Sequence, residues 1–231
     1  NAARSLAETF NMIQPDWSGF NVLQRAASRT GGIDLGFLPQ QNGLATNAIL
    51  QACEQDKMDV VWLHGADEID MKRLNKAFVI YQGHHGDAGA HRADVILPGA
   101  AYTEKNAIYV NTEGRAQLGQ QAVFPPGQAK EDWAIIRAFS QTYGKVLPFN
   151  SLAELRAKMF EVAPVLGHIG KFTTITDMPR LGKADFSGLS SAPFTSTISN
   201  FYMTDPISRA SETMAKCTSE ILGAAWIEAA A

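Results

Sequence analysis

Three short runs of β-branched and aromatic residues in the middle of the chain restrict its fold more than any other feature. They cover residues 58–63, 78–81 and 95–97, and glycine or proline follows each run. About 13 to 14 residues separate consecutive runs, close to the shortest crossover that joins two parallel strands. Continuous apolar strands between short helical segments are typical of a parallel sheet covered on both faces. The sequence therefore predicts an α/β fold with a Rossmann-like parallel sheet flanked by helices, complete or in part.

Apolar residues at helical spacing predict helices on both sides of these strands. The expected helices cover about residues 6–13, 17–27, 44–55, 133–143 and 152–162. Asp16 or Ser18 is available to cap the second helix, and Gly31-Gly32 is expected to end it. Ser151 opens the last one in a Ser-x-x-Glu capping box. Residues 107–111 and 115–118 flank a turn that contains Gly114, which predicts a hairpin.

The carboxy-terminal third of the chain contains two segments of different composition and periodicity. Residues 167–200 are rich in Ser, Thr, Gly and Pro and show no periodicity, so an irregular surface segment is expected there. Asp205-Pro206 then predicts the start of a helix. An apolar stripe along that helix predicts a docking face, made of Ile207, Ala210, Met214, Cys217 and Ile221.

These elements predict four parts along the chain. A Rossmann-like α/β domain with its hairpin is expected at residues 1–125, followed by a helical pair at 126–166. The irregular segment at 167–200 and a docking helix at 201–231 complete the chain.

Charge and hydropathy exclude two classes of protein. With 20 Lys and Arg against 23 Asp and Glu, the chain lacks the basic excess that drives binding to nucleic acid. No window approaches the ~18 consecutive apolar residues that a membrane span needs. Charged residues are 19% of the chain, below the usual ~25%, which favours a surface that is partly buried against something else. The first residues, NAAR, include no Met and no signal-peptide pattern, so a piece of a longer protein is expected.

The chain has two cysteines, Cys53 and Cys217. A structural zinc site or an iron–sulfur cluster usually needs four ligands, mostly thiolates, so these two cannot supply one. We expect both to be reduced and packed against apolar neighbours.

The segment 81–92 holds most of the candidate chemistry, directly after the second predicted strand, where open α/β sheets bind ligands. Its glycines, Gly83, Gly86 and Gly89, follow G-x-x-G-x-x-G, which differs from the dinucleotide fingerprint, and the chain has no P-loop motif. Three histidines and a carboxylate invite a metal hypothesis; they are His84, His85, His91 and Asp87. The alternative is a polar loop that hydrogen-bonds to backbone or to a partner.

Other acidic residues have comparable alternatives. Asp67 and Glu68 follow the first predicted strand, where an acid would hold a ribose hydroxyl or cap the next helix. Glu104 and Glu113 could pair as acid and base, but the sequence does not fix their distance. Neither cysteine lies in a recognisable nucleophile motif, and no G-x-S-x-G is present. Spacing alone therefore supports no catalytic claim.

Several long motifs resemble one family. They lie in residues 78–87, 93–105, 109–117 and 201–217, with shorter similarities at 17–23 and 34–37. They resemble the carboxy-terminal part of the large iron–sulfur subunit, the G-type subunit, of NADH:quinone oxidoreductase, respiratory complex I. The mitochondrial and alphaproteobacterial branch of that family is the most similar. The segment 167–200 resembles nothing known to us.

Part of this pattern is similar to molybdopterin-dependent oxidoreductases, in which this region helps to build a pterin-cofactor domain. That part runs from Ala93 to Pro98, then includes Glu104, and continues from Asn111 to Arg115. The resemblance implies that the complex I branch has lost the cofactor, and that Gly83, His84, Gly86, Asp87 and Asn111 mark the remains of its pocket. It also implies that iron–sulfur clusters lie outside this segment, in cysteine-rich motifs that this chain lacks.

The resemblance therefore implies a non-catalytic structural domain in an enzyme that carries electrons from NADH towards quinone. Its expected partners are the other peripheral-arm subunits and the cluster-bearing amino-terminal part of its own subunit. Its expected place is the matrix side of the inner mitochondrial membrane, or the cytoplasmic face of the bacterial inner membrane. A retained molybdenum or tungsten pterin domain, and a stand-alone nucleotide-binding domain, are the alternatives.

Overall fold

The computed structural model describes residues 2–14, 17–24, 26, 28–39, 41, 43–171, 191–193, 195, 196 and 198–223. The chain divides into two compact units. We call residues 39–105, 121–147 and 195–231 the sheet unit, and residues 1–38, 106–120 and 148–194 the hairpin unit.

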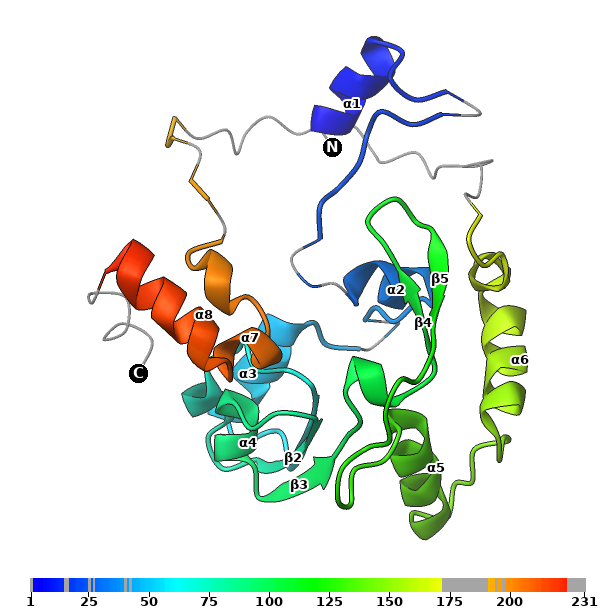
Figure 1. Cartoon of the computed structure of the whole chain (residues 1–231), viewed down its shortest axis with the longest axis vertical. Helices are drawn as coiled ribbons and strands as arrows, with labels where there is room; N and C mark the ends of the chain where they lie inside the picture. Colours follow the sequence, from blue (N-terminus) through cyan, green and yellow to red (C-terminus); the bar gives the residue numbers. More distant parts are fainter. Residues whose placement is uncertain are drawn as a thin grey trace. The chain divides into compact units, whose positions relative to one another are not determined.

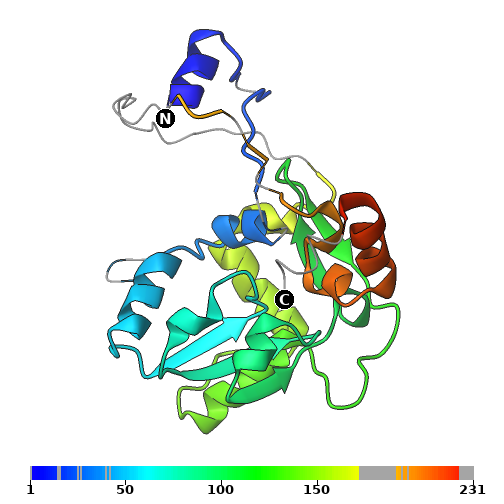
Figure 2. The same ribbon diagram turned by 90° about the vertical axis from the view of Figure 1, so that its left-hand side faces the viewer.

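The sheet unit is built on three parallel strands in the order β1, β2, β3. They cover Val60–His64, Phe78–Gly83 and Val95–Pro98. Val60 pairs with Phe78, and Ile80 pairs with Val95, so the three strands reach the same edge with their carboxyl ends. The strands lie side by side in Figure 2, and α4 lies against them in Figure 1. All three predicted runs therefore form the predicted parallel sheet.

Alternate side chains of the sheet face two different sets of helices, as the two-residue period of a strand requires. Val61, Leu63, Val79 and Tyr81 are buried in one cluster with Leu50 and Cys53 of α3, which spans Thr46–Glu54. On the alternate positions, the Trp62 ring meets the edge of Phe139, with ring centroids 4.8 Å apart. Phe139 belongs to α5, Asp132–Thr142, so apolar side chains contact both faces of the sheet.

Short helical elements complete the sheet unit. They are η1 (Met71–Leu74), α4 (Ala88–Arg92), η2 (Tyr102–Glu104), η4 (Phe201–Met203), α7 (Pro206–Arg209), α8 (Glu212–Cys217) and η5 (Thr218–Leu222), the last a π-helical turn.

The hairpin unit contains the predicted antiparallel pair, β4 (Ala107–Val110) and β5 (Ala116–Gly119). Gly114 lies in the turn with a φ of 82°, a conformation that glycine adopts without steric cost. Its helical elements are α1 (Ala2–Thr9), α2 (Arg29–Asp34), α6 (Leu152–Val162) and η3 (Pro164–Gly167). Val110, Ala116, Ala163 and Leu166 form its buried core.

The predicted helix at residues 17–27 is wrong. The described residues between Trp17 and Gln24 form no helix, and Gly31-Gly32 lies inside α2 instead of ending a helix. Trp17 is 59% and Leu23 82% exposed, so the stripe has no core to pack on, and short helices depend on such packing. Ser18 does not cap a helix, and Pro15, Asp16 and Ala27 lie outside the described residues.

The single helix predicted after Asp205 is also wrong in its continuity. Asp205 does cap α7, where its carboxylate accepts hydrogen bonds from the amides of Ile207 and Ser208. The helix ends at Arg209, and the Ser211 side chain caps a second helix, α8, by accepting from the amide of Met214. A serine cap with Glu212 behind it is the sequence signal for this new start.

The described residues include no helix with the length and apolar character that crossing a membrane requires. Most of the predicted irregular segment at 167–200 lies outside the described residues, and the four predicted domain boundaries remain a prediction.

Candidate functional site

The carboxyl edge of the parallel sheet carries most of the candidate residues. His64 ends β1, Gly83 ends β2, and residues 84–87 lead from β2 into α4. This edge is where open α/β sheets bind ligands, so the partners of each side chain there decide what the site can do.

Two glycines of the G-x-x-G-x-x-G motif make room for the Tyr81 ring. A Cβ atom on Gly83 would lie 2.6 Å from the Tyr81 hydroxyl oxygen, and one on Gly89 would lie 2.6 Å from its ring carbons. A Cβ on Gly86 would meet nothing within 4 Å. Glycine is therefore needed at positions 83 and 89, because the Tyr81 ring fills the space that a Cβ atom would take there.

The Tyr81 side chain is held in place by Asp67. Its hydroxyl donates to Oδ2 of Asp67 at 2.9 Å, and Oδ1 of Asp67 accepts from the Gly89 amide at 2.8 Å. Burial, followed by the hydrogen bond and charge of Asp67, raises the pKa of Tyr81 above its ordinary range. Asp67 is buried, and its two oxygens accept hydrogen bonds from Tyr81 and Gly89. Its position after β1 had suggested a ribose hydroxyl as the partner.

Asp87 caps α4 and binds a distant arginine. Its Oδ1 accepts from the Ala88 amide at 2.8 Å, and its Oδ2 accepts from Nε of Arg209 at 2.5 Å. Nη2 of Arg209 donates to Oε1 of Glu68 at 3.0 Å. Two of the predicted acidic residues, Asp87 and Glu68, thus share one guanidinium group.

A second polar cluster surrounds Asp132, a residue that the sequence patterns did not single out. Nζ of Lys105 lies 2.5 Å from Oδ2 of Asp132, and Nε2 of Gln82 donates to Oδ1 at 3.0 Å. Nε2 of His64 lies 3.4 Å from the same Oδ1. Burial by itself would raise the pKa of Asp132, but the hydrogen bonds from His64, Lys105 and Gln82 lower it below its ordinary range.

The opposite end of the Gln82 amide is fully buried and has no hydrogen-bond partner: Oε1 receives no donor. The orientation of this amide follows from its neighbours, because the atoms of Asp132 nearest to Nε2 are acceptors. Polar residues directly after the predicted runs 58–63 and 78–81, as His64 and Gln82 are, were the available sequence signal for this cluster.

The histidines do not gather around a metal position. Nδ1 of His84 lies 2.6 Å from Nδ1 of His85, so one ring donates and the other accepts. Burial, and then the nearby His85 and Lys105, lower the pKa of His84. Among the described residues, no three His, Cys, Asp or Glu side chains are arranged to hold a metal ion.

The remaining candidates have local roles. Asn111 belongs to the hairpin unit, where its Oδ1 accepts from the amides of Glu113 and Arg115 and holds the turn. Glu104 belongs to the sheet unit, where it accepts from the Ala101 amide at 2.9 Å. An open hollow of about 390 Å³ near Glu104 and Phe124 contains none of the other candidates.

The contacts at the carboxyl edge bear on whether it fits a pterin cofactor with its metal. Such a group needs free backbone faces and unpaired polar side chains, and in the sheet unit the face of Gly83 is covered by Tyr81. Asp87 is paired with Arg209, and the two neighbouring histidines bind each other. The described residues of this edge do not fit the cofactor.

Comparison with known proteins adds a second line of observation. Residues 1–142 match the molybdopterin oxidoreductase family, and residues 179–217 match a family described as the C-terminal part of the G subunit of NADH-ubiquinone oxidoreductase.

Three curated proteins illustrate the similarity. NADH dehydrogenase (ubiquinone) iron-sulfur protein 1 from Solanum tuberosum is 41% identical over 218 residues, which cover 94% of this chain and 28% of that protein. The NADH-ubiquinone oxidoreductase 78 kDa subunit from Neurospora crassa is 42% identical over 90% of this chain and 28% of its own length. The G subunit of NADH-quinone oxidoreductase from Rickettsia bellii is 41% identical over 92% of this chain and 29% of its own length. The chain therefore spans less than a third of these relatives.

Proposed function

Because the chain belongs to the molybdopterin oxidoreductase family, as the C-terminal region of a homologue of the G subunit of NADH:quinone oxidoreductase, we propose that it is a structural, non-catalytic domain of respiratory complex I. In this role the longer subunit passes electrons from NADH towards quinone through iron–sulfur clusters that lie outside this region. The region itself supplies shape and contact surfaces.

The closed carboxyl edge is the observation that carries this proposal. An enzyme of this family type would keep the edge available to a cofactor, whereas here Tyr81 covers Gly83 and Gly89, and Arg209 binds Asp87. The two cysteines of the chain also fall short of the four ligands of an iron–sulfur cluster. The relative from Solanum tuberosum, which is named as an iron–sulfur protein, is more than three times as long as this chain, which leaves room for clusters elsewhere in it.

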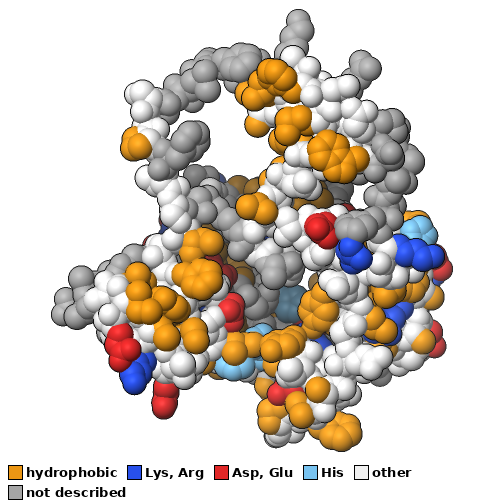
Figure 3. Space-filling view, turned by 45° about the horizontal axis from the view of Figure 1, so that its top comes forward, with side chains coloured by type: hydrophobic (Ala, Val, Ile, Leu, Met, Phe, Trp, Pro, Cys, Tyr) orange, Lys and Arg blue, Asp and Glu red, His pale blue; other side chains and the backbone are white. Residues whose placement is uncertain are grey.

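The proposal includes partners and a location. Its partners are the other peripheral-arm subunits and the cluster-bearing amino-terminal part of the same subunit. Its location is the matrix side of the inner mitochondrial membrane, or the cytoplasmic face of the bacterial one. In support, large apolar side chains are exposed in the sheet unit, including Phe124 at 88%, Phe201 at 75% and Tyr143 at 67%. Apolar side chains are also visible across the face drawn in Figure 3, and such surfaces mark interaction sites when they are extensive.

Elemental analysis of the purified protein for molybdenum, tungsten and iron is the direct test. We expect each metal to stay at background. One molybdenum or tungsten per chain would overturn the proposal in favour of the alternative, a retained pterin-cofactor domain. In that case His84→Ala or Asn111→Ala should lower the metal content.

Docking is tested separately with a purified peripheral arm. Ile221→Asp combined with Phe201→Asp places charges on two exposed apolar positions, 63% and 75% exposed, and should weaken binding. Met214 is half-buried, so its replacement would disturb the segment itself. Thr213→Asp adds a charge to an exposed polar position of the same segment and serves as the control. Equal binding by both variants would argue against docking through residues 198–223.

A further inference from the structure

Arg209 joins parts of the sheet unit that are far apart in the sequence. Its guanidinium binds Asp87, 122 positions earlier, through Nε at 2.5 Å, and Glu68, 141 positions earlier, through Nη2 at 3.0 Å. The Arg209 and Asp87 side chains are only 25% and 21% exposed, which reduces solvent screening of their attraction. The planar, multidentate shape of arginine suits two carboxylates at once.

Both carboxylates lie at the carboxyl edge of the sheet. Asp87 caps α4 directly after β2, and Glu68 lies in the loop after β1. A phosphate or another anionic ligand is unfavourable beside two carboxylates, whereas a cation is favourable. The negative charge of this edge therefore favours binding of a basic side chain.

The segment that carries Arg209 is held together by its own contacts. Asp205 caps α7, Ser211 caps α8, and Nδ2 of Asn200 lies 3.2 Å from Oγ1 of Thr218. Nη1 of Arg209 also reaches the carbonyl oxygen of Met203 at 3.4 Å. We call residues 198–223 the C-terminal segment. Its internal contacts hold the part of the chain from which the Arg209 guanidinium extends.

We propose that the carboxyl edge of the sheet is a docking surface for the C-terminal segment of the same chain, with Arg209 as its anchor. The segment takes the place that a ligand takes in other α/β sheets, and its guanidinium neutralises the two carboxylates of the edge. Asp87 and Glu68 fall in the molybdopterin oxidoreductase match at 1–142, and Arg209 falls in the second family match at 179–217.

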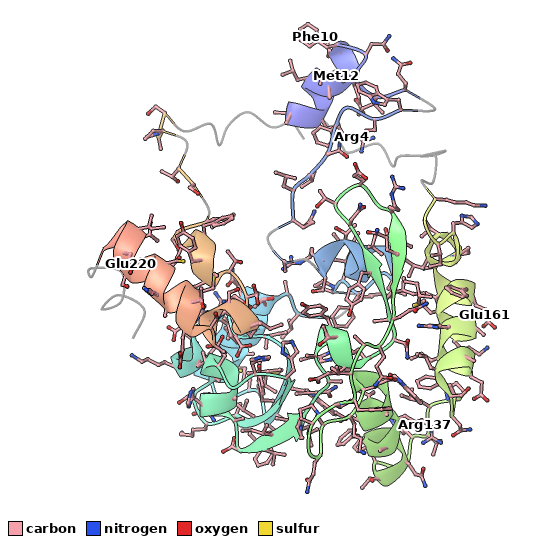
Figure 4. The ribbon with its side chains drawn as sticks, viewed as in Figure 1. Arg4, Phe10, Met12, Arg137, Glu161 and Glu220 are labelled. Atoms are coloured by element: carbon pink, nitrogen blue, oxygen red, sulfur yellow. The ribbon has the colours of Figure 1, made fainter. Side chains whose placement is uncertain are left out.

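Hydrogen exchange on the purified 231-residue protein tests the anchor. Arg209→Gln removes the charge. As a control, Lys216→Gln removes an exposed charge of the same segment, whose ion pair among the described residues is with Glu220, one turn away. Glu220 lies on the final turn of this segment (Figure 4). Arg209→Gln should speed exchange of the amides in α7, α8 and α4 about tenfold, equivalent to about 1.4 kcal/mol. Lys216→Gln should leave these amides unchanged.

Carbodiimide labelling of carboxylates gives a second readout. In Arg209→Gln, Asp87 and Glu68 should be labelled several times faster, whereas the exposed Asp59 should keep its rate in both variants. Equal exchange and equal labelling in the two variants would overturn the proposal.

A charge exchange keeps the test decisive if Arg209→Gln folds poorly. Glu68→Gln is the milder variant, and adding it to Arg209→Gln should speed exchange less than the sum of the two separate effects. Glu68→Arg with Arg209→Glu should restore part of the protection that Arg209→Glu alone removes. Additive effects and no restoration would reject the anchor. These results do not depend on metal content or on binding to complex I, so this inference and the proposed function fail separately.

Discussion

The Tyr81 side chain explains two of the three glycines in the G-x-x-G-x-x-G motif. Its ring occupies the space above Gly83 and Gly89, and its hydroxyl is bound to Asp67. A glycine motif after a strand predicts close approach of backbone to a partner, and here the partner is a tyrosine of the same strand. The pattern of the motif does not distinguish a ligand from a neighbouring ring.

Replacing the glycines separates these roles. Gly83→Ala should lower the free energy of unfolding by about 1–3 kcal/mol, because the new Cβ collides with a buried ring that cannot move freely. Gly86→Ala is the matched control, since nothing lies within 4 Å of the position that its Cβ would occupy. Urea unfolding of the two variants measures the difference, and equal stabilities would contradict the packing role of Gly83.

Asp132 should contribute stability that depends on pH. Its pKa in the folded chain lies below the ordinary value of 3.8, so its contribution is complete above that pH and is lost as the pH falls through the lower folded value. Asp132→Asn leaves Lys105 without its carboxylate and should cost about 2–4 kcal/mol at neutral pH.

The measurement is urea unfolding between pH 7 and pH 3. The difference between the native protein and Asp132→Asn should shrink below pH 3.8. Asp59→Asn, at an exposed position, should show no comparable change. A difference that stays constant down to pH 3 would show that the ion pair is not the source of the effect.

At the scale of elements, the sequence predicted the strands, turns and helices whose formation depends on neighbouring residues. The three β-branched runs, the hairpin around Gly114 and the capped helix after Ser151 each contain their own signal, and each forms as expected. The stripe at 17–27 has helical spacing without a core to bury it, and the described residues there form no helix. Phe10 and Met12, which follow α1, are likewise exposed (Figure 4). Spacing alone does not supply a packing partner.

Helix capping gives a prediction for one element. Oγ of Ser151 accepts from the Glu154 amide at 3.2 Å, so Ser151→Ala should lower stability by about 1 kcal/mol. Ser28 stands at the equivalent position before α2 but its side chain makes no cap hydrogen bond, so Ser28→Ala should change little. Thermal unfolding followed by circular dichroism compares the two, and a larger effect at Ser28 would contradict this assignment.

At the scale of the molecule, the candidate site depends on contacts that the sequence does not display. Lys105 and Asp132 are 27 positions apart, and Gln82 and Asp132 are 50 apart. The edge itself was predictable, because each predicted run is followed by polar residues, glycine or proline. The pairing of its charges arises only when distant segments fold together. The sequence therefore indicated the edge at which the candidate residues lie, but it gave no sign of the contacts that Lys105, Asp132 and Arg209 make there.

The buried thiol of Cys53 reports on opening of the whole sheet unit, and Cys217 serves as the comparison. Cys53 is 1% exposed in its core, and burial raises the pKa of its thiol, so a maleimide should react with it only when the unit opens. Cys217 is half-buried on α8 and should react in the folded protein. Labelling of Cys53→Ser and Cys217→Ser variants separates the two rates, and equal rates at both thiols would contradict the described core.

The order of synthesis gives the contact between Arg209 and Asp87 a further consequence. A ribosome adds about 5–20 residues per second, so the 122 positions between the two take on the order of ten seconds to make. During that interval Asp87 and Glu68 have already been made, but the arginine that binds both of them has not. Each new molecule thus gains this contact only after Arg209 has been made, well after the three strands of the sheet.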